Sequence, residues 1–105
     1  MKTGIELITE ERKKQIDKHG FTAEHHVNHP EWYDRLQLED AAINILHPFI
    51  TATEDNMPET PENWDKEWFE NLCKRNREER LIIAAALIAA ELDRLQLISK
   101  LQNED

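Results

Sequence analysis

Residues 81–95 of this chain read LIIAAALIAAELDRL. The first ten of them are apolar without interruption, so a helix formed here has almost no polar face. Five of these ten residues are alanines, whose small side chains let neighbouring helices approach closely. The stretch therefore predicts the central helix of the fold, which begins in the charged segment 74–80 and continues to about residue 101.

The composition of the whole chain also favours helices. Its 105 residues are 33% charged and 39% hydrophobic, and only two of them are glycines. The good helix formers Glu, Leu, Ala, Lys and Arg dominate, which argues for helices over a sheet. A chain of this length forms one domain around a single core. The sequence thus predicts one all-α domain over residues 1–105, a small bundle of about four helices.

A first partner helix is predicted from about residue 4 to residue 19. Thr3 and Glu6 have the spacing of a capping box, and Gly20 is placed to end the helix. One stripe of the helix carries Ile5, Ile8, Arg12, Ile16 and His19, with Glu11 and Gln15 along its flank. Polar groups therefore interrupt the core face. Either long side chains such as Arg12 extend their charged ends to solvent, or these groups belong to a site.

A second helix is predicted over residues 31–46, before a proline. One of its faces carries Trp32, Leu36, Ile43 and His47. Glu39 and Asp40 lie within that face instead of opposite to it. These two carboxylates either form a site or pair with a cation such as Arg12 or Arg35.

A short third helix is predicted after Asn63, which could cap it. This helix holds Trp64, Trp68 and Leu72. Residues 21–30 carry three of the five histidines and end in a proline, so a structured connection is expected there. Residues 51–62 are polar and contain two prolines, which predicts an exposed loop.

Charge and cysteine content exclude several classes of function. The net charge of −9 disfavours nucleic-acid binding, which requires clustered Lys and Arg. The apolar run 81–90 is about half the roughly 20 residues of a membrane span, and the N-terminus has no apolar signal core. Cys73 is the only cysteine, so no internal disulfide can form. No nucleic acid and no membrane are expected as partners, and the cytoplasm is the expected compartment.

Four carboxylates on predicted helices form a candidate metal site. They are Glu11, Glu39, Asp40 and Glu91. Glu91 flanks the buried stripe of its helix, whereas Asp93 is predicted to point to the opposite side. If the four converge in a bundle cavity, their oxygens suit Mg²⁺, and without a cation they would repel one another. The alternative for Glu91 is a structural pair with an arginine of a neighbouring helix.

Histidines and aromatic residues form a second group of candidate ligand contacts. His25, His26 and His29 are spaced to meet on a helical turn, but without HExxH or a second cysteine they are a weak zinc pattern. Contact with a phosphate or a helix cap is the favoured alternative. The aromatic residues that could stack on a base are Trp32, Tyr33, Trp64 and Trp68, although core positions are their ordinary explanation.

Several segments resemble a family of short phage and prophage proteins. The segments are GIELI at 4–8, Glu11-Arg12, Gln15, GFT at 20–22, Glu24-His25, His29 and ALIAAELDRL at 86–95. That family is loosely similar to the all-α nucleoside-triphosphate pyrophosphohydrolases, the MazG-like proteins, which hold Mg²⁺ with an E-x-x-E and an E-x-x-D pair. Here Glu39 and Asp40 are adjacent and Glu91 and Asp93 are two apart, which weighs against hydrolysis more than against nucleotide binding.

The sequence therefore predicts a protein that binds a phosphate-bearing nucleotide. The expected ligand contacts are Arg12, Gln15, His25, His29 and Trp68, with Mg²⁺ as the candidate cofactor of the carboxylates. The resemblance implies a role in sequestering a nucleotide second messenger against a host defence, in the host cytoplasm. A homo-oligomer is expected through the alanine-rich helix. The alternatives are a Mg²⁺-dependent pyrophosphohydrolase and an acidic module that binds a protein partner.

Overall fold

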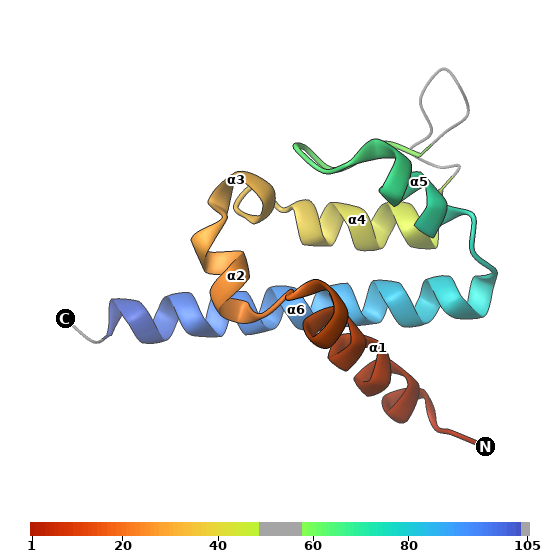
Figure 1. Cartoon of the computed structure of the whole chain (residues 1–105), viewed down its shortest axis with the longest axis horizontal. Coiled ribbons are helices and arrows are strands. Elements are labelled where there is room, and N and C mark those ends of the chain that lie inside the picture. The colour runs from red at the N-terminus through yellow and green to blue at the C-terminus, as the bar shows by residue number, and fades with distance from the viewer. Residues whose placement is uncertain (49–57, 104–105) are drawn as a thin grey trace.

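A computed structural model describes residues 1–48 and 58–103, which form an all-α fold (Figure 1). The helices are α1 (Gly4–His19), α2 (Ala23–Asn28), α3 (Pro30–Tyr33), α4 (Gln37–Leu46), α5 (Lys66–Cys73) and α6 (Arg77–Gln102). The predicted fold class is confirmed. Most of the predicted loop at 51–62 lies outside the described residues, as does the end of the predicted polar tail.

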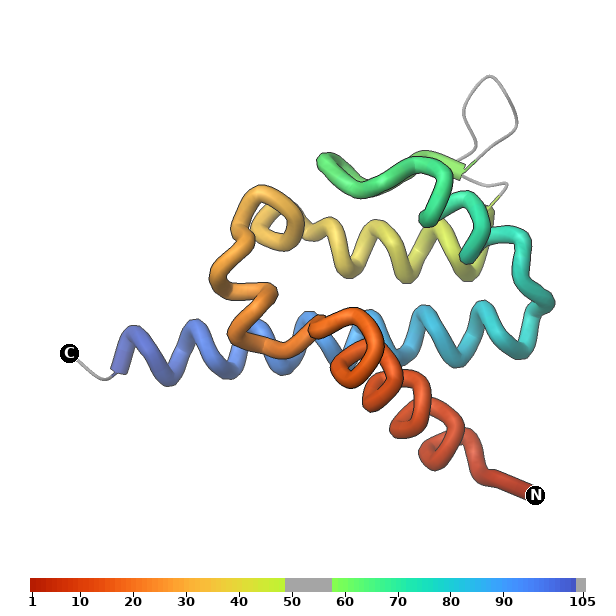
Figure 2. Tube along the Cα trace, in the orientation of Figure 1, coloured from red at the N-terminus to blue at the C-terminus, as the bar shows by residue number. Residues whose placement is uncertain are grey.

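The longest helix, α6, is the centre of the fold, as its apolar sequence predicts. The helices α1, α2 and α4 all pack on it. Figures 1 and 2 show α4 running alongside α6 in the opposite direction, while α1 crosses α6 near its middle. The short helix α5 packs on α4. Within the described ranges, no helix is both long and apolar enough to cross a lipid bilayer.

The core forms mainly where α4 meets α6. From α4 it takes Leu38, Ala41, Ala42 and Ile45, and from α6 it takes Ile83, Ala84, Leu87 and Ala90. Tyr33 and Phe69 complete it from α3 and α5. The alanines on both helices present almost no side chain, so the two backbones can approach closely.

The predicted helix at 31–46 is interrupted at Leu36, and the expected apolar face was wrong. Leu36 has a φ of +64° and precedes α4, so the chain turns between α3 and α4. Leu36 and Ile43 are 56% and 52% exposed. Because the buried face is built on Leu38 and Ile45, the neighbouring residues Glu39 and Asp40 lie on the exposed side.

One further helix and two helix boundaries also differ from the predictions, which expected a connection without a helix at residues 21–30. Residues 21–30 contain α2, where Thr22 accepts a hydrogen bond from the backbone of His25 at 3.1 Å. Helix α5 is capped by Asp65 instead of Asn63, which has a φ of +70°. The last helix begins after Asn76, which caps it, and not at residue 74.

Helix α1 follows its predicted bounds, but it packs through polar residues. The capping box of Thr3 and Glu6 is formed, and Gly20 ends the helix in the left-handed conformation. Ile5 is 79% exposed, whereas Arg12 and Gln15 are the buried residues of the helix. Arg12 does not extend to solvent, because it finds polar partners inside the fold.

Candidate functional site

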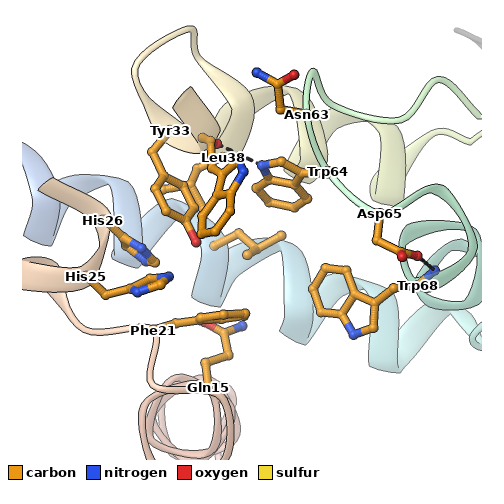
Figure 3. Close-up of a pocket in the computed structure, with 12 residues that line it drawn as sticks. Gln15, Phe21, His25, His26, Tyr33, Leu38, Asn63, Trp64, Asp65 and Trp68 are labelled. Atoms are coloured by element: carbon orange, nitrogen blue, oxygen red, sulfur yellow. Dashed lines mark hydrogen bonds between the residues drawn. The ribbon is translucent and has the colours of Figure 1, made fainter. Parts of the chain in front are cut away.

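A cavity of about 400 Å³ opens between α1 and α2 on one side and α3 and α5 on the other (Figure 3). Most of its lining is aromatic, and we call it the aromatic pocket. Its lining residues are Gln15, Phe21, His25, His26, Trp32, Tyr33, Leu38, Asn63, Trp64, Asp65, Trp68 and Leu87. The volume falls within the range of about 300–1,000 Å³ that is typical of small-molecule sites.

Local hydrogen bonds hold the two sides of the pocket in place. The indole N–H of Trp64 donates to the carbonyl oxygen of Trp32 at 2.8 Å, which joins α3 to the segment before α5. The carboxylate of Asp65 accepts from the backbone N–H of Trp68 at 2.8 Å and so caps α5 (Figure 3). These contacts hold the Trp64 side chain and the backbone of Trp32 and Trp68 in place.

The rings around the pocket also pack on one another. Phe21 lies between His25, which is stacked with it at 5.7 Å, and Trp68, which meets it edge-on at 6.3 Å. The His26 ring is 4.1 Å from that of Tyr33. Flat faces and edges thus surround the cavity, an arrangement suited to a planar heterocyclic ligand.

Two buried polar side chains in the pocket wall lack partners. Among the described residues, no group forms a hydrogen bond with either ring nitrogen of His26 or with Gln15 Oε1. His26 is only 2% exposed, and both side chains point toward the cavity in Figure 3. An unpaired buried polar group costs about 1–3 kcal/mol. A ligand that paired with these atoms would remove that cost.

The environment keeps the His26 ring neutral. Burial, together with the smaller effect of the nearby positive charges of Arg12, His25 and Arg94, lowers its pKa from 6.5 to about 3. A neutral imidazole has one N–H donor and one ring-nitrogen acceptor. With the Gln15 oxygen as a second acceptor, the wall presents one donor and two acceptors to a ligand.

The pocket brings together three of the five predicted ligand contacts. Gln15, His25 and Trp68 line it. Arg12 does not, because its guanidinium binds Asp93 at 3.2 Å and the Phe21 carbonyl at 2.8 Å. His29 does not line the pocket either, because its ring stacks on Trp32 at 4.5 Å and pairs with Glu31 at 3.0 Å.

Several pocket residues were not among the five predicted ligand contacts. They are Phe21, His26, Trp32, Tyr33 and Trp64. Of these, Trp32, Tyr33 and Trp64 are among the aromatic residues that the sequence makes candidates for stacking on a base. The concentration of aromatic residues and histidines between residues 21 and 33 was a usable signal for them. Trp64 and Tyr33 also pack with the core, so the core explanation and the site explanation both apply.

The four predicted metal carboxylates do not come together. Glu91 is buried and pairs with Arg94 of its own helix at 2.5 Å, not with a neighbouring helix. Asp40 lies beside a separate groove with Glu59, and its pKa is raised by burial and by that neighbour. Glu39 is exposed, and Glu11 lines a different groove. Within residues 1–48 and 58–103, no three His, Cys, Asp or Glu side chains are grouped to hold a metal ion.

Comparison of the chain with known protein families, with curated proteins and with solved structures finds no match. Function must therefore be inferred from the chemistry of the aromatic pocket itself. Three properties matter most: its aromatic walls, its neutral buried histidine and its unpaired amide oxygen.

Proposed function

We propose that this protein binds a nucleotide-type small molecule and places its base in the aromatic pocket. The observation that carries the proposal is the set of unpartnered polar atoms, Gln15 Oε1 and both ring nitrogens of His26, in the wall of a cavity lined mostly by aromatic rings. Nucleobases combine a flat aromatic surface with donors and acceptors along one edge. Both properties have counterparts in the pocket.

Stacking supplies the affinity in this proposal, and the polar atoms supply the selectivity. A base stacked on an aromatic side chain gains about 1–3 kcal/mol. The Gln15 oxygen accepts a hydrogen bond from a ring N–H or an exocyclic amino group. The neutral His26 ring donates one hydrogen bond and accepts another. A hydrocarbon of the same shape would leave these groups unpaired.

Sequestration fits the pocket better than hydrolysis does. Asp65 is the only carboxylate among the residues that line the aromatic pocket, and it already caps α5. Mg²⁺-assisted hydrolysis needs several carboxylates beside the bound phosphates. The proposed role is capture of an intact nucleotide, such as a second messenger of host defence.

The proposal is tested by titrating nucleosides, nucleotides and cyclic dinucleotides into the protein while following tryptophan fluorescence and heat release. All three tryptophans line the pocket, so a bound base should quench their emission. High-performance liquid chromatography of the mixture should recover the ligand unchanged, with or without Mg²⁺.

Two matched variants make the test specific. Gln15→Met removes the unpaired oxygen with little change of shape and should weaken binding by about tenfold, the value of one hydrogen bond of about 1.4 kcal/mol. Gln96→Met makes the same change at an exposed position of α6 and should have no effect. Absence of binding by every compound, or equal effects of the two variants, would exclude the proposal.

A further inference from the structure

A second, smaller groove adjoins the aromatic pocket. Its volume is about 160 Å³. The two cavities share four lining residues, Gln15, Phe21, Trp68 and Leu87. The two cavities are therefore adjacent, and Phe21 and Trp68 line both of them.

The second groove differs from the first in its charge. Its remaining lining includes three basic side chains, Lys14 and His19 from α1 and Arg75 from the turn before α6, and one acid, Glu11. Leu72 and Ile83 form its apolar part. We call it the basic groove. It lies in a chain whose net charge is −9, so a local excess of cations is not a consequence of composition.

The cations of the basic groove can be engaged by a ligand. Within the described part of the chain, no carboxylate oxygen lies within 4.0 Å of the Lys14 ammonium group. Arg75 contacts Glu79 at 3.3 Å, but both side chains are nearly half exposed. An exposed pair of this kind contributes only about 0–1 kcal/mol, so a phosphate can compete for the guanidinium.

His19 is fixed at the border between the two cavities. Its ring stacks on Phe21 at 5.3 Å and meets Trp68 edge-on at 6.5 Å. Phe21 thus lines the aromatic pocket, and the His19 ring stacked on it brings an N–H donor to the basic groove. This arrangement links recognition of a ring with recognition of an anion next to it.

We infer that the basic groove binds the phosphate of a nucleotide whose base occupies the aromatic pocket. The inference rests on the proposed function and adds the place where the phosphate of the nucleotide binds. Arginine matches phosphate oxygens with paired N–H donors, and lysine adds a compact positive charge. Glu11 opposes the anion and limits how much negative charge the groove accepts.

The test compares the four common ribonucleosides with their 5′-monophosphates by calorimetry. With the wild-type protein, the monophosphate of the preferred base should bind about tenfold more tightly than its nucleoside, as expected for one or two charge-assisted hydrogen bonds. Raising the salt concentration should reduce this difference, because salt screens the charges of an exposed groove.

Variants assign the difference to the basic groove. The double variant Lys14→Ala/Arg75→Ala should bind nucleoside and monophosphate equally, with nucleoside affinity unchanged. The control Lys13→Ala/Lys100→Ala removes the same charge elsewhere and should keep the difference; Lys13 lines another groove, beside Asp93. Glu11→Gln should increase the preference for the monophosphate.

The outcomes separate the inference from the proposed function. If nucleosides bind in the aromatic pocket but the monophosphate gains nothing, or if the gain survives Lys14→Ala/Arg75→Ala, the inference is wrong and the proposed function stands. If neither nucleosides nor monophosphates bind, both fail.

Discussion

The guanidinium of Arg12 on α1 lies 3.2 Å from a carboxylate oxygen of Asp93 on α6, although the two residues are 81 positions apart in the chain. The same guanidinium donates to the carbonyl oxygen of Phe21 at 2.8 Å. The buried guanidinium of Arg12 thus links α1 to α6 and to Phe21, which lines the aromatic pocket. Ile5 and Ile16 are exposed, so they contribute little to the packing of α1. This polar contact therefore helps to attach α1 to α6, a role that an apolar stripe has in other helices.

Arg12→Ala should therefore destabilise the fold by about 2–4 kcal/mol, because it removes charged hydrogen bonds and leaves the Phe21 carbonyl unpaired. Asp93→Asn should cost only about 0.5–1 kcal/mol, since that carboxylate is nearly half exposed. Urea unfolding followed by circular dichroism measures both. Lys13→Ala, an exposed neighbour, is the control and should change stability by less than about 0.5 kcal/mol. Equal effects of Arg12→Ala and Lys13→Ala would contradict this role.

Glu91 and Arg94 form a buried ion pair within α6, and a test of it needs single and double variants. Glu91 is 5% exposed, and its second oxygen has no partner among the described residues. Arg94→Met should cost about 3–5 kcal/mol because it leaves a buried charge unpaired. Glu91→Leu/Arg94→Met should recover most of that loss, because two apolar side chains need no partner. A double variant no more stable than Arg94→Met would show that the pair has another role.

Stability should fall as the pH is lowered from about 6.5 towards 3, and His26 should contribute to the fall. Its pKa is about 3 in the folded state and 6.5 ordinarily, so the unfolded chain binds the proton first. Each pH unit in this window then costs about 1.4 kcal/mol. Urea unfolding at several pH values measures the slope. His26→Gln should flatten it, whereas His47→Gln, at an exposed position, should not.

Leu36 holds a left-handed backbone conformation that a leucine adopts at a cost. Its φ is +64° and its side chain is largely exposed, so Leu36→Gly loses little packing. The substitution should raise the free energy of unfolding by about 0.5–1 kcal/mol. Gly20→Ala makes the opposite change at a φ of +67° and should lower it by a similar amount. Thermal and urea unfolding of both variants would reveal a sign opposite to either expectation.

The predicted homo-oligomer would use an apolar stripe on the exposed side of α6. Leu81, Ile88, Leu92 and Leu95 follow a spacing of seven, four and three residues, and each is between 43% and 56% exposed. This spacing places them on one face, as in helices that pair. Analytical ultracentrifugation should detect a dimer or larger species, and Ile88→Glu/Leu92→Glu should convert it to a monomer with unchanged helicity. A wild-type monomer at high concentration would refute this prediction.

Features that depend on residues close together in the chain could be predicted from the sequence alone. The capping box of Thr3 and Glu6, the terminating Gly20 and the apolar run 81–90 act within a few positions. They predicted α1, the central position of α6 and the all-α class correctly. Gln15, His25 and Trp68 could also be recognised as candidate contacts, because polar and aromatic groups stand out against helical periodicity.

Which helix faces are buried, and which distant residues come into contact, depends on how the helices pack against one another. The turn at Leu36 costs about 1–2 kcal/mol, which no local signal in the sequence predicts, and the burial of Leu38 and Ile45 on α6 offsets it. The partner of Arg12 lies 81 residues away, and the aromatic pocket joins α1, α2, α3 and α5. Such contacts have no period along the chain, because they arise from packing between helices and not from the geometry of one helix.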